Sequence, residues 1–292
     1  MPGRAYRPSP CRLPEAPGVE HAREFIEPAI QAAGSVPSVV DDERERIAGW
    51  YQWVDSVRAN LAALHERIDR AAIVAGRPPQ DVALLLATKT QPPEIVRSAV
   101  LAHGALDPGR PLLLGENRVQ ELVAKGPALE DLRVPYHLIG PLQSNKVNAA
   151  LRWADAIDSV ASLETAERLA ARRALRFADL DVMVQVNVSG EATKHGVSPG
   201  YAADLALEVA AMDGLRLVGF QTIGALDGDL GVVQAGFATL REVRDAVVAS
   251  GEPGTGTATE LSMGMSADLE LAVAEGATIV RIGTAVFGSR GD

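Results

Sequence analysis

The stretch VALLLATKTQPP, residues 82–93, decides the fold that we expect for this chain. The run from Val82 to Thr88 carries no charge, and it ends at Lys89, shortly before a Pro-Pro pair. An apolar run in which polar residues do not alternate is typical of a strand that is buried on both faces, as parallel strands are. We therefore predict a parallel strand that leaves the protein core at a lysine.

Seven further runs of this kind follow along the chain, and segments with apolar residues at helical spacing lie between them, such as EIVRSAVLAHG and VQAGFATLREVRDAVVASG. Eight consecutive strand–helix units predict a single closed (β/α)₈ barrel rather than an open sheet. The seven runs are PLLLG (111–115), YHLIG (136–140), ADAID (154–158), VMVQVNV (182–188), LRLVGF (215–220), ATELS (258–262) and TIVRIG (278–283).

The chain before the first strand has two parts. Residues 41–76 carry apolar residues at three- and four-residue spacing and predict a long amphipathic helix that ends at Gly76. Residues 1–45 are rich in Pro, Arg and Glu and lack sustained periodicity, although residues 20–33 could form a short helix. We predict a flexible or loosely attached extension over residues 1–45 and one barrel domain over residues 46–292.

Composition excludes several classes of function. The net charge of −10 disfavours nucleic-acid binding, which depends on basic residues that neutralise phosphates. No apolar stretch approaches the roughly 20 residues that span a bilayer, and the N-terminus lacks the apolar region of a secretory signal. Cys11 is the one cysteine in the sequence, which excludes an internal disulfide. We expect a cytoplasmic monomer.

In a (β/α)₈ barrel the functional residues lie at the carboxyl ends of the strands and in the loops that follow. Lys89, Asn117 and His137 are candidates by this rule. Lys89 has two interpretations. It is either a surface lysine in a loop or an amine that is partly desolvated at the barrel mouth, where it can form a Schiff base with a carbonyl. His137 alone reads as a core histidine with satisfied hydrogen bonds.

The seventh and eighth strands end in small residues with hydrogen-bond donors. Loops after these two strands form the recurrent phosphate site of such barrels, because glycines let backbone N–H groups approach a phosphate. Ser266 is also a candidate N-cap of the helix that follows. The alternative interpretation is ordinary capping and turns. The residues concerned are Ser262, Gly264, Ser266, Gly283 and Thr284.

Arg281 lies inside the eighth strand, between Val280 and Ile282. Alternation places it on the face opposite to these two neighbours. If that face is the barrel interior, the guanidinium needs an acceptor, which is either a ligand atom or the carboxylate of an internal salt bridge. The five histidines show no metal-ligand spacing, and no P-loop, G-x-S-x-G or G-x-G-x-x-G motif follows a strand.

Taken together, these residues resemble the pyridoxal 5′-phosphate (PLP) homeostasis proteins, also called the YggS/PROSC family. The resemblance covers about residues 55 to 290 in family order. It departs from the family at Arg118, where the family usually has Tyr, and at Gln221, where it often has Met. Both residues lie near the expected cofactor mouth. The matching pieces are LLLATKT, GENRVQE, YHLIGPLQSNK, VQVNVSGEATKHG and LSMGMSADLELAVAEGATIVRIGTAVFGSR.

The resemblance implies a (β/α)₈ barrel of the alanine-racemase type with PLP held as a Schiff base on Lys89. It implies that Arg281 faces the pyridine nitrogen and that Asn117 and His137 line the pocket. The residues that it implies for the phosphate are Ser262, Met263, Gly264, Ser266, Gly283 and Thr284.

The resemblance further implies a carrier or buffer that passes PLP to apo-enzymes in vitamin B6 homeostasis, without established catalysis. Arg281 would keep the pyridine nitrogen unprotonated, which weakens the ring as an electron sink. We also expect no domain after Thr284 that could supply a second base. Two alternatives stay open: an amino-acid racemase-like or decarboxylase-like PLP enzyme, and an aldolase that uses Lys89 on a sugar phosphate without PLP.

Overall fold

The computed structural model describes residues 43–173, 178–225 and 229–288. Eight parallel strands close into a barrel in the order of the sequence, and β8 pairs with β1. All eight predicted strands are confirmed, with ends that differ by one to three residues. The strands are β1 (Ala83–Ala87), β2 (Leu112–Glu116), β3 (Tyr136–Leu138), β4 (Ala156–Val160), β5 (Leu180–Gln185), β6 (Leu215–Gln221), β7 (Glu260–Ser262) and β8 (Ile279–Ile282).

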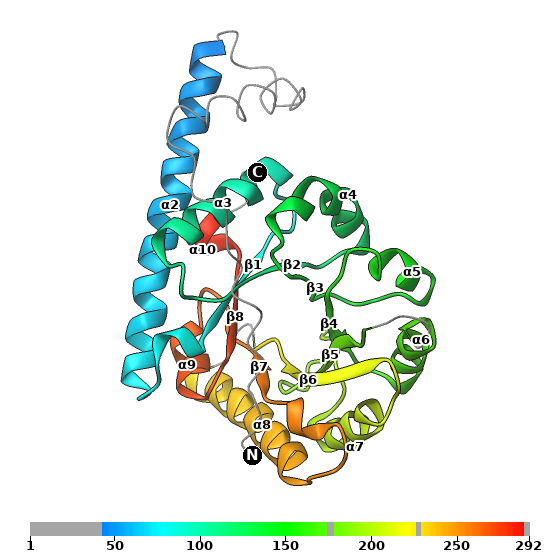
Figure 1. The fold of residues 1–292 in the computed structure, drawn as a ribbon. Helices are drawn as coiled ribbons and strands as arrows, with labels where there is room; N and C mark the ends of the chain where they lie inside the picture. Colours follow the sequence, from blue (N-terminus) through cyan, green and yellow to red (C-terminus); the bar gives the residue numbers. More distant parts are fainter. Residues whose placement is uncertain (1–42, 174–177, 226–228, 289–292) are drawn as a thin grey trace.

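Helices surround the barrel (Figure 1). The helix after β8 has only one turn, and the long α2, which precedes β1, packs against α3, α9 and α10 and so covers this side of the barrel. The helices are α2 (Glu43–Val74), α3 (Pro93–Leu106), α4 (Val119–Leu129), α5 (Val147–Ala150), α6 (Leu163–Arg173), α7 (Pro199–Ala210), α8 (Leu230–Ala249), α9 (Leu269–Ala274) and α10 (Thr284–Phe287), with 3₁₀ turns η1 (Pro79–Asp81), η2 (Glu130–Leu132), η3 (Ser144–Lys146) and η4 (Thr255–Thr257).

Local sequence explains where the principal helices begin and end. Pro93 and Pro199 occupy the first positions of α3 and α7, where the missing N–H of proline costs no intrahelical bond. Asp229 caps α8 by accepting a hydrogen bond from the Gly231 amide at 3.0 Å. The predicted stop of α2 is confirmed, because Gly76 has a φ of +68° directly after the last turn.

The strands sort their side chains into two layers. Outward residues such as Leu84 and Leu86 of β1 join the large core between the strands and the helices. Inward residues form a small separate apolar cluster at the bottom of the barrel, which consists of Leu85, Leu113, Met183, Val218 and Ile279. Arg281 has the same parity on β8 as Ile279 and therefore points into the barrel, as the sequence predicts.

Two predictions about chain segments have different outcomes. The interpretation of Ser266 as a helix N-cap is wrong, since α9 begins at Leu269 and Asp268 is its N-cap residue. The Asp268 carboxylate accepts a hydrogen bond from the Met265 amide at 2.6 Å, outside the helix, and makes no side-chain capping bond to α9. The predicted extension over residues 1–45 and its short helix lie outside the described residues, apart from residues 43–45, which belong to α2. This domain boundary stays a prediction.

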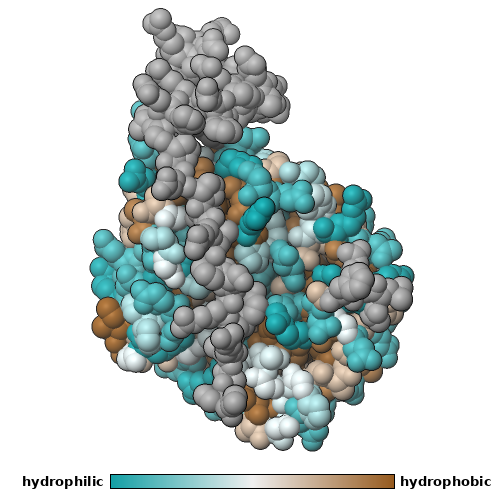
Figure 2. Space-filling model, viewed as in Figure 1, coloured by the Kyte–Doolittle hydropathy of each residue, from teal (hydrophilic) through white to brown (hydrophobic). Residues whose placement is uncertain are grey.

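The described surface carries few large apolar residues. Figure 2 shows mostly hydrophilic residues over the outer helices on this face, with hydrophobic residues in small groups. Ile73 and Val74 at the end of α2 and Leu230 and Val232 at the start of α8 are the most exposed of the large apolar residues. None of the described helices is long and apolar enough to cross a membrane.

Candidate functional site

Lys89 lies in a tight turn that begins one residue after β1 ends. The Gln91 amide donates to the Thr88 carbonyl at 3.0 Å, so Lys89 is the second residue of a four-residue turn. The Lys89 side chain is exposed and makes no hydrogen bond or ion pair with the described residues. The expectation of a partly desolvated amine is therefore wrong for this structure. The amine is free to reach a ligand at the barrel mouth.

Thr90 follows Lys89 with a φ of +64°. A positive φ at the third position of such a turn is normally supplied by glycine, and a β-branched residue there is strained. The Thr90 amide donates to the Glu121 carboxylate at 2.8 Å, which holds the residue in this conformation.

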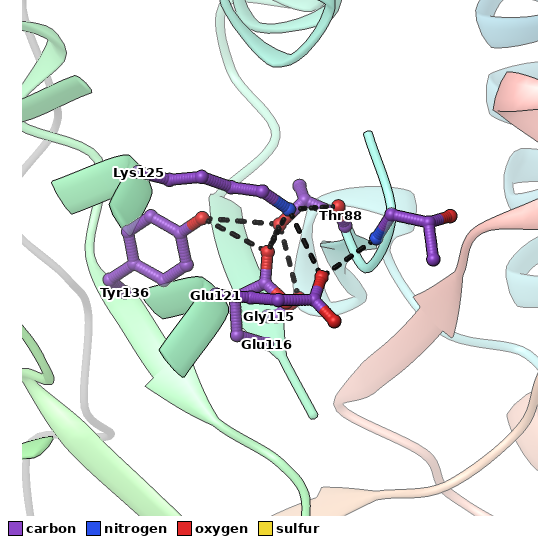
Figure 3. A network of polar contacts seen from close by, with 7 residues as sticks. Thr88, Gly115, Glu116, Glu121, Lys125 and Tyr136 are labelled. Atoms are coloured by element: carbon purple, nitrogen blue, oxygen red, sulfur yellow. Dashed lines mark hydrogen bonds and ion pairs between the residues drawn. The ribbon is translucent and has the colours of Figure 1, made fainter. Parts of the chain in front are cut away.

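A buried polar cluster lies directly beside this turn (Figure 3). The Lys125 ammonium donates to the Thr88 carbonyl at 2.6 Å and to Glu116 Oε1 at 2.5 Å. Glu116 Oε1 also accepts a hydrogen bond from the Thr88 hydroxyl at 2.7 Å. Tyr136 closes the cluster, with its hydroxyl 3.2 Å from the Thr88 hydroxyl. Desolvation raises the pKa of Glu116, and the hydrogen bonds from Lys125 and Thr88 oppose this shift.

Arg281 is buried, with 6% of its surface exposed. Its Nη1 donates to Ser262 Oγ at 2.9 Å and its Nη2 donates to the Thr222 carbonyl at 2.6 Å. Among the described residues, no carboxylate lies within 4 Å of the guanidinium, so the internal salt bridge that we considered is not formed. Burial lowers the pKa of Arg281 to about 10, which leaves the side chain charged at neutral pH. An acceptor from a ligand would complete this site.

The loops after β7 and β8 contain the candidate phosphate residues. The Arg281 amide donates to the Gly264 carbonyl at 2.9 Å, which joins the loop after β7 to β8. The amides of Gly264 and Ser266 donate no hydrogen bond to any described residue and are available to an anion. Gly264 has a φ of +91°, a backbone conformation that favours glycine at this position of the loop.

The remaining candidates for the phosphate differ in orientation. The Ser262 hydroxyl is committed to Arg281, and the Met263 side chain is fully buried in the outer core, so only its backbone could serve a ligand. Thr284 is exposed at the start of α10. Gly283 lies so close to β1 that a Cβ there would be 3.1 Å from the Ala87 carbonyl oxygen, which places this loop beside the strand that leads to Lys89.

Asn117 is exposed in the loop after β2. Its backbone touches the loop after β3, because a Cβ on Gly140 would lie 2.2 Å from the Asn117 carbonyl oxygen. Arg118, the next residue, is exposed and precedes α4 without a side-chain capping bond. The two loops therefore fix the Asn117 backbone, while its side chain is free.

His137 is buried in β3 and bonds to Asp158 of β4, with Nδ1 2.9 Å from Oδ1. Burial alone would lower the pKa of His137, but the charge and hydrogen bond of Asp158 raise it overall. His137 Nε2 has no partner among the described residues, and neither do Oε1 of Gln185 and Oε1 of Gln221. Three buried polar atoms without partners are costly unless a ligand or water meets them.

The structure joins some of the predicted residues directly and separates others. Arg281, Ser262 and Gly264 are linked by hydrogen bonds, and Lys89, Asn117 and Thr284 surround them from loops at the same end of the barrel. The sequence did not reveal Asp158 as the partner of His137 or Lys125 as part of the cluster. The spacing of Glu121 and Lys125 is the signal that was available, but it is also that of an ordinary surface pair on a helix.

Comparison with known proteins identifies a matching family model and a named relative. The family model described as "Alanine racemase, N-terminal domain" matches residues 59–291. A protein of Pseudomonas aeruginosa named pyridoxal phosphate homeostasis protein is 41% identical over 237 residues, which cover 81% of this chain and 97% of that protein.

Two solved structures are also similar. A protein from Bifidobacterium adolescentis described as unknown is 38% identical, with a TM-score of 0.74, and the match covers 85% of this chain and 98% of that chain. PipY of Synechococcus elongatus, in a structure with PLP bound, is 33% identical, with a TM-score of 0.63, and the match covers 76% of this chain and 99% of that chain.

Proposed function

Because this chain belongs to the pyridoxal phosphate homeostasis protein family, within the alanine racemase N-terminal domain family, we propose that it binds PLP on Lys89 and acts as a PLP carrier or buffer in vitamin B6 homeostasis. The single observation that carries the proposal is the buried Arg281, whose guanidinium bonds to a hydroxyl and a backbone carbonyl, with no described carboxylate within 4 Å. A buried guanidinium that is not ion-paired gains from a further hydrogen-bond acceptor, and a ring nitrogen with a lone pair would supply one.

The donor set of the barrel mouth fits this cofactor. Lys89 offers an exposed amine without a partner among the described residues, and the Gly264 and Ser266 amides, which donate to none of these residues, are available to a phosphate. When bound, PLP supplies an aldehyde carbon that amines attack. Lys89 would hold the cofactor covalently through its amine, and Arg281 would hold the ring nitrogen, where its charge would disfavour protonation of that nitrogen.

The other predicted residues take supporting roles in this proposal. Asn117 and His137 line the pocket, with His137 held in one orientation by Asp158. Ser262 orients Arg281 through the hydrogen bond at 2.9 Å, and the backbone of Met263, Gly283 and Thr284 forms the loops at the phosphate.

We propose the cytoplasm as the site of action, a monomer as the functional unit, and PLP-dependent apo-enzymes as the recipients of the cofactor. The barrel would carry this function by itself, and residues 1–45 would form an extension to it. An exposed Lys89 supports transfer, because an amine at the surface can exchange its aldehyde with an incoming protein.

Absorption spectroscopy tests the proposal. The purified protein is titrated with PLP, and the same titration is performed on Lys89→Ala and on the control Lys146→Ala. We expect a visible absorption band in the wild type and in the control but not in Lys89→Ala. A band of unchanged position and intensity in Lys89→Ala would contradict the assignment of the lysine.

A second candidate is an amino-acid racemase-like PLP enzyme, which the buried His137–Asp158 pair favours because Nε2 could hold or release a proton. Incubation of the PLP-loaded protein with L- and D-amino acids in deuterated water separates the two functions. Exchange of the α-proton at enzyme-like rates would favour the enzyme, and its absence would favour the carrier.

A further inference from the structure

The two neighbours of Lys89 in the chain are both held by the same buried cluster. Thr88 is bound through its carbonyl by Lys125 at 2.6 Å and through its hydroxyl by Glu116 at 2.7 Å. Thr90 is bound through its amide by Glu121 at 2.8 Å. Lys125 also lies 3.5 Å from Glu121 and 2.5 Å from Glu116, so one ammonium connects both carboxylates.

Burying this cluster is expensive for the protein. Glu116 is fully buried and Lys125 is 7% exposed. The desolvation of two such charges roughly offsets their mutual attraction, so a buried pair is weak evidence for stability. The pair of Glu116 and Lys125 does, however, fix the groups that it contacts (Figure 3). Two of these contacts are to the hydroxyl and the carbonyl of Thr88, and a third is to the Glu121 carboxylate, which binds the Thr90 amide.

The backbone at Thr90 independently indicates that the turn is forced. A φ of +64° is unfavourable for a β-branched residue such as threonine and persists only where surrounding contacts impose it. Elsewhere in the described chain, Arg133 alone among residues other than glycine has a positive φ. Lys89 and Thr90 are both exposed, so packing of the core does not explain the strained backbone at Thr90.

We propose that Lys125 is a positioning residue, which acts through Glu116 and Glu121 to hold the 88–91 turn in the strained form that presents Lys89 at the barrel mouth. The inference rests on the proposed function, in which Lys89 is the point of PLP attachment. Without the cluster, Thr90 relaxes to a negative φ, the turn opens, and the amine is directed away from Arg281 and the phosphate loops.

The test uses two readouts on the full chain. Hydrogen exchange of the Thr90 and Gln91 amides, measured by NMR on cofactor-free protein, reports the turn itself. The rate at which PLP attaches, followed by visible absorption, reports the presentation of Lys89. The main variant is Glu116→Gln with Lys125→Met, which removes both buried charges together. The control is Glu164→Gln with Arg168→Met, an exposed ion pair on α6.

We expect the main variant to exchange both amides about tenfold faster and to attach PLP about tenfold more slowly, the effect of losing roughly one hydrogen bond to a charged group. The control should change neither rate. Adding Thr90→Gly to the main variant should restore most of the attachment rate, because glycine adopts a positive φ without strain. Attachment that stays slow after this change would overturn the proposal.

Glu121→Ala provides a second route if the main variant does not fold, because Glu121 lies at the edge of the cluster with 25% of its side chain exposed. It should accelerate exchange of the Thr90 amide and slow attachment. Wild-type exchange and attachment rates in a folded variant would overturn the proposal. Failure of the wild type to attach PLP at all would instead contradict the proposed function, and the exchange data would still decide whether the cluster holds the turn.

Discussion

Arg281 of β8 donates a hydrogen bond to Ser262 of β7 at 2.9 Å, at the edge where the two strands leave the barrel. The partner is a neutral hydroxyl, although the cation is buried, and no described carboxylate lies within 4 Å. The contact therefore orients the guanidinium without neutralising it. A ligand with an acceptor atom gains a fixed, charged donor at this position.

Ser262→Ala should weaken PLP binding, because the Arg281 guanidinium loses its hydrogen bond to Ser262, keeps the bond to the Thr222 carbonyl and gains rotational freedom. We expect the dissociation constant to rise about tenfold, which corresponds to about 1.4 kcal/mol. Equilibrium titration followed by absorption measures this change. The control is Ser56→Ala on α2, whose hydroxyl bonds only locally to the Gln52 carbonyl. Equal affinities for Ser262→Ala and the control would show that this hydrogen bond does not orient Arg281.

Gly140→Ala should displace the loop that carries Asn117. A Cβ at this position would lie 2.2 Å from the Asn117 carbonyl oxygen, so one of the two loops must move. We expect a loss of about 1–3 kcal/mol in the free energy of unfolding and weaker PLP binding. Urea denaturation measures the first effect.

The matched control for this change is Gly200→Ala in α7, where an added Cβ meets no atom within 4 Å. It should leave the urea midpoint unchanged or raise it slightly. If Gly140→Ala were as stable as this control, the close approach between the two loops would not exist in solution.

His65 and His103 join α2 to α3 through a hydrogen bond of 3.0 Å between their rings. His103 Nε2 must donate to the Arg110 carbonyl, so its Nδ1 accepts the bond from His65 Nε2 and both rings are neutral. Burial lowers the pKa of His65 to about 4 and also lowers the pKa of His103. The unfolded chain therefore binds more protons than the folded chain between these values and the ordinary pKa of 6.5.

We predict that the stability of this contact is fully present above pH 6.5 and is lost as the pH falls toward 4. Between these limits the free energy of unfolding should fall by about 2 kcal/mol after allowance for solvent screening. His65→Gln, which keeps a donor but does not titrate, should flatten the slope of urea midpoint against pH. An identical slope in the wild type and in the variant would contradict this account.

Asp158→Asn should lower the pKa of His137, since the carboxylate is the group that raises it against the effect of burial. NMR titration of the His137 ring measures this shift directly. Asp155→Asn is the nearby control, because its contribution to the same pKa is smaller. A His137 pKa that did not fall in Asp158→Asn would show that the ring and the carboxylate are not paired.

Much of this architecture could be predicted from the sequence, because a parallel strand that is buried on both faces appears in the sequence as a short apolar run without alternating polar residues. The run ALLLA is apolar on both faces, and IVRI departs from this pattern only at Arg281. Alternation placed Arg281 on the face opposite to Val280 and Ile282, and the structure shows that this face is the barrel interior. Family resemblance then predicted the chemistry at the strand ends.

Other features depend on contacts that no local pattern encodes. Lys125 is buried because α4 packs against α3, α5 and β2 and its ammonium reaches the Thr88 carbonyl, whereas helical spacing by itself suggests a surface pair with Glu121. Asp158 meets His137 through strand pairing across 21 positions. Ser266 was misjudged as a cap because α9 begins at Leu269, two residues later than a cap at Ser266 requires.

The most direct test of the account is to locate the covalent bond to PLP. The protein is loaded with PLP, reduced with borohydride and digested, and the modified peptide is identified by mass spectrometry. The account predicts one major adduct on Lys89 in the wild type and its loss in Lys89→Arg. A major adduct on another lysine, with Lys89 unmodified, would contradict it.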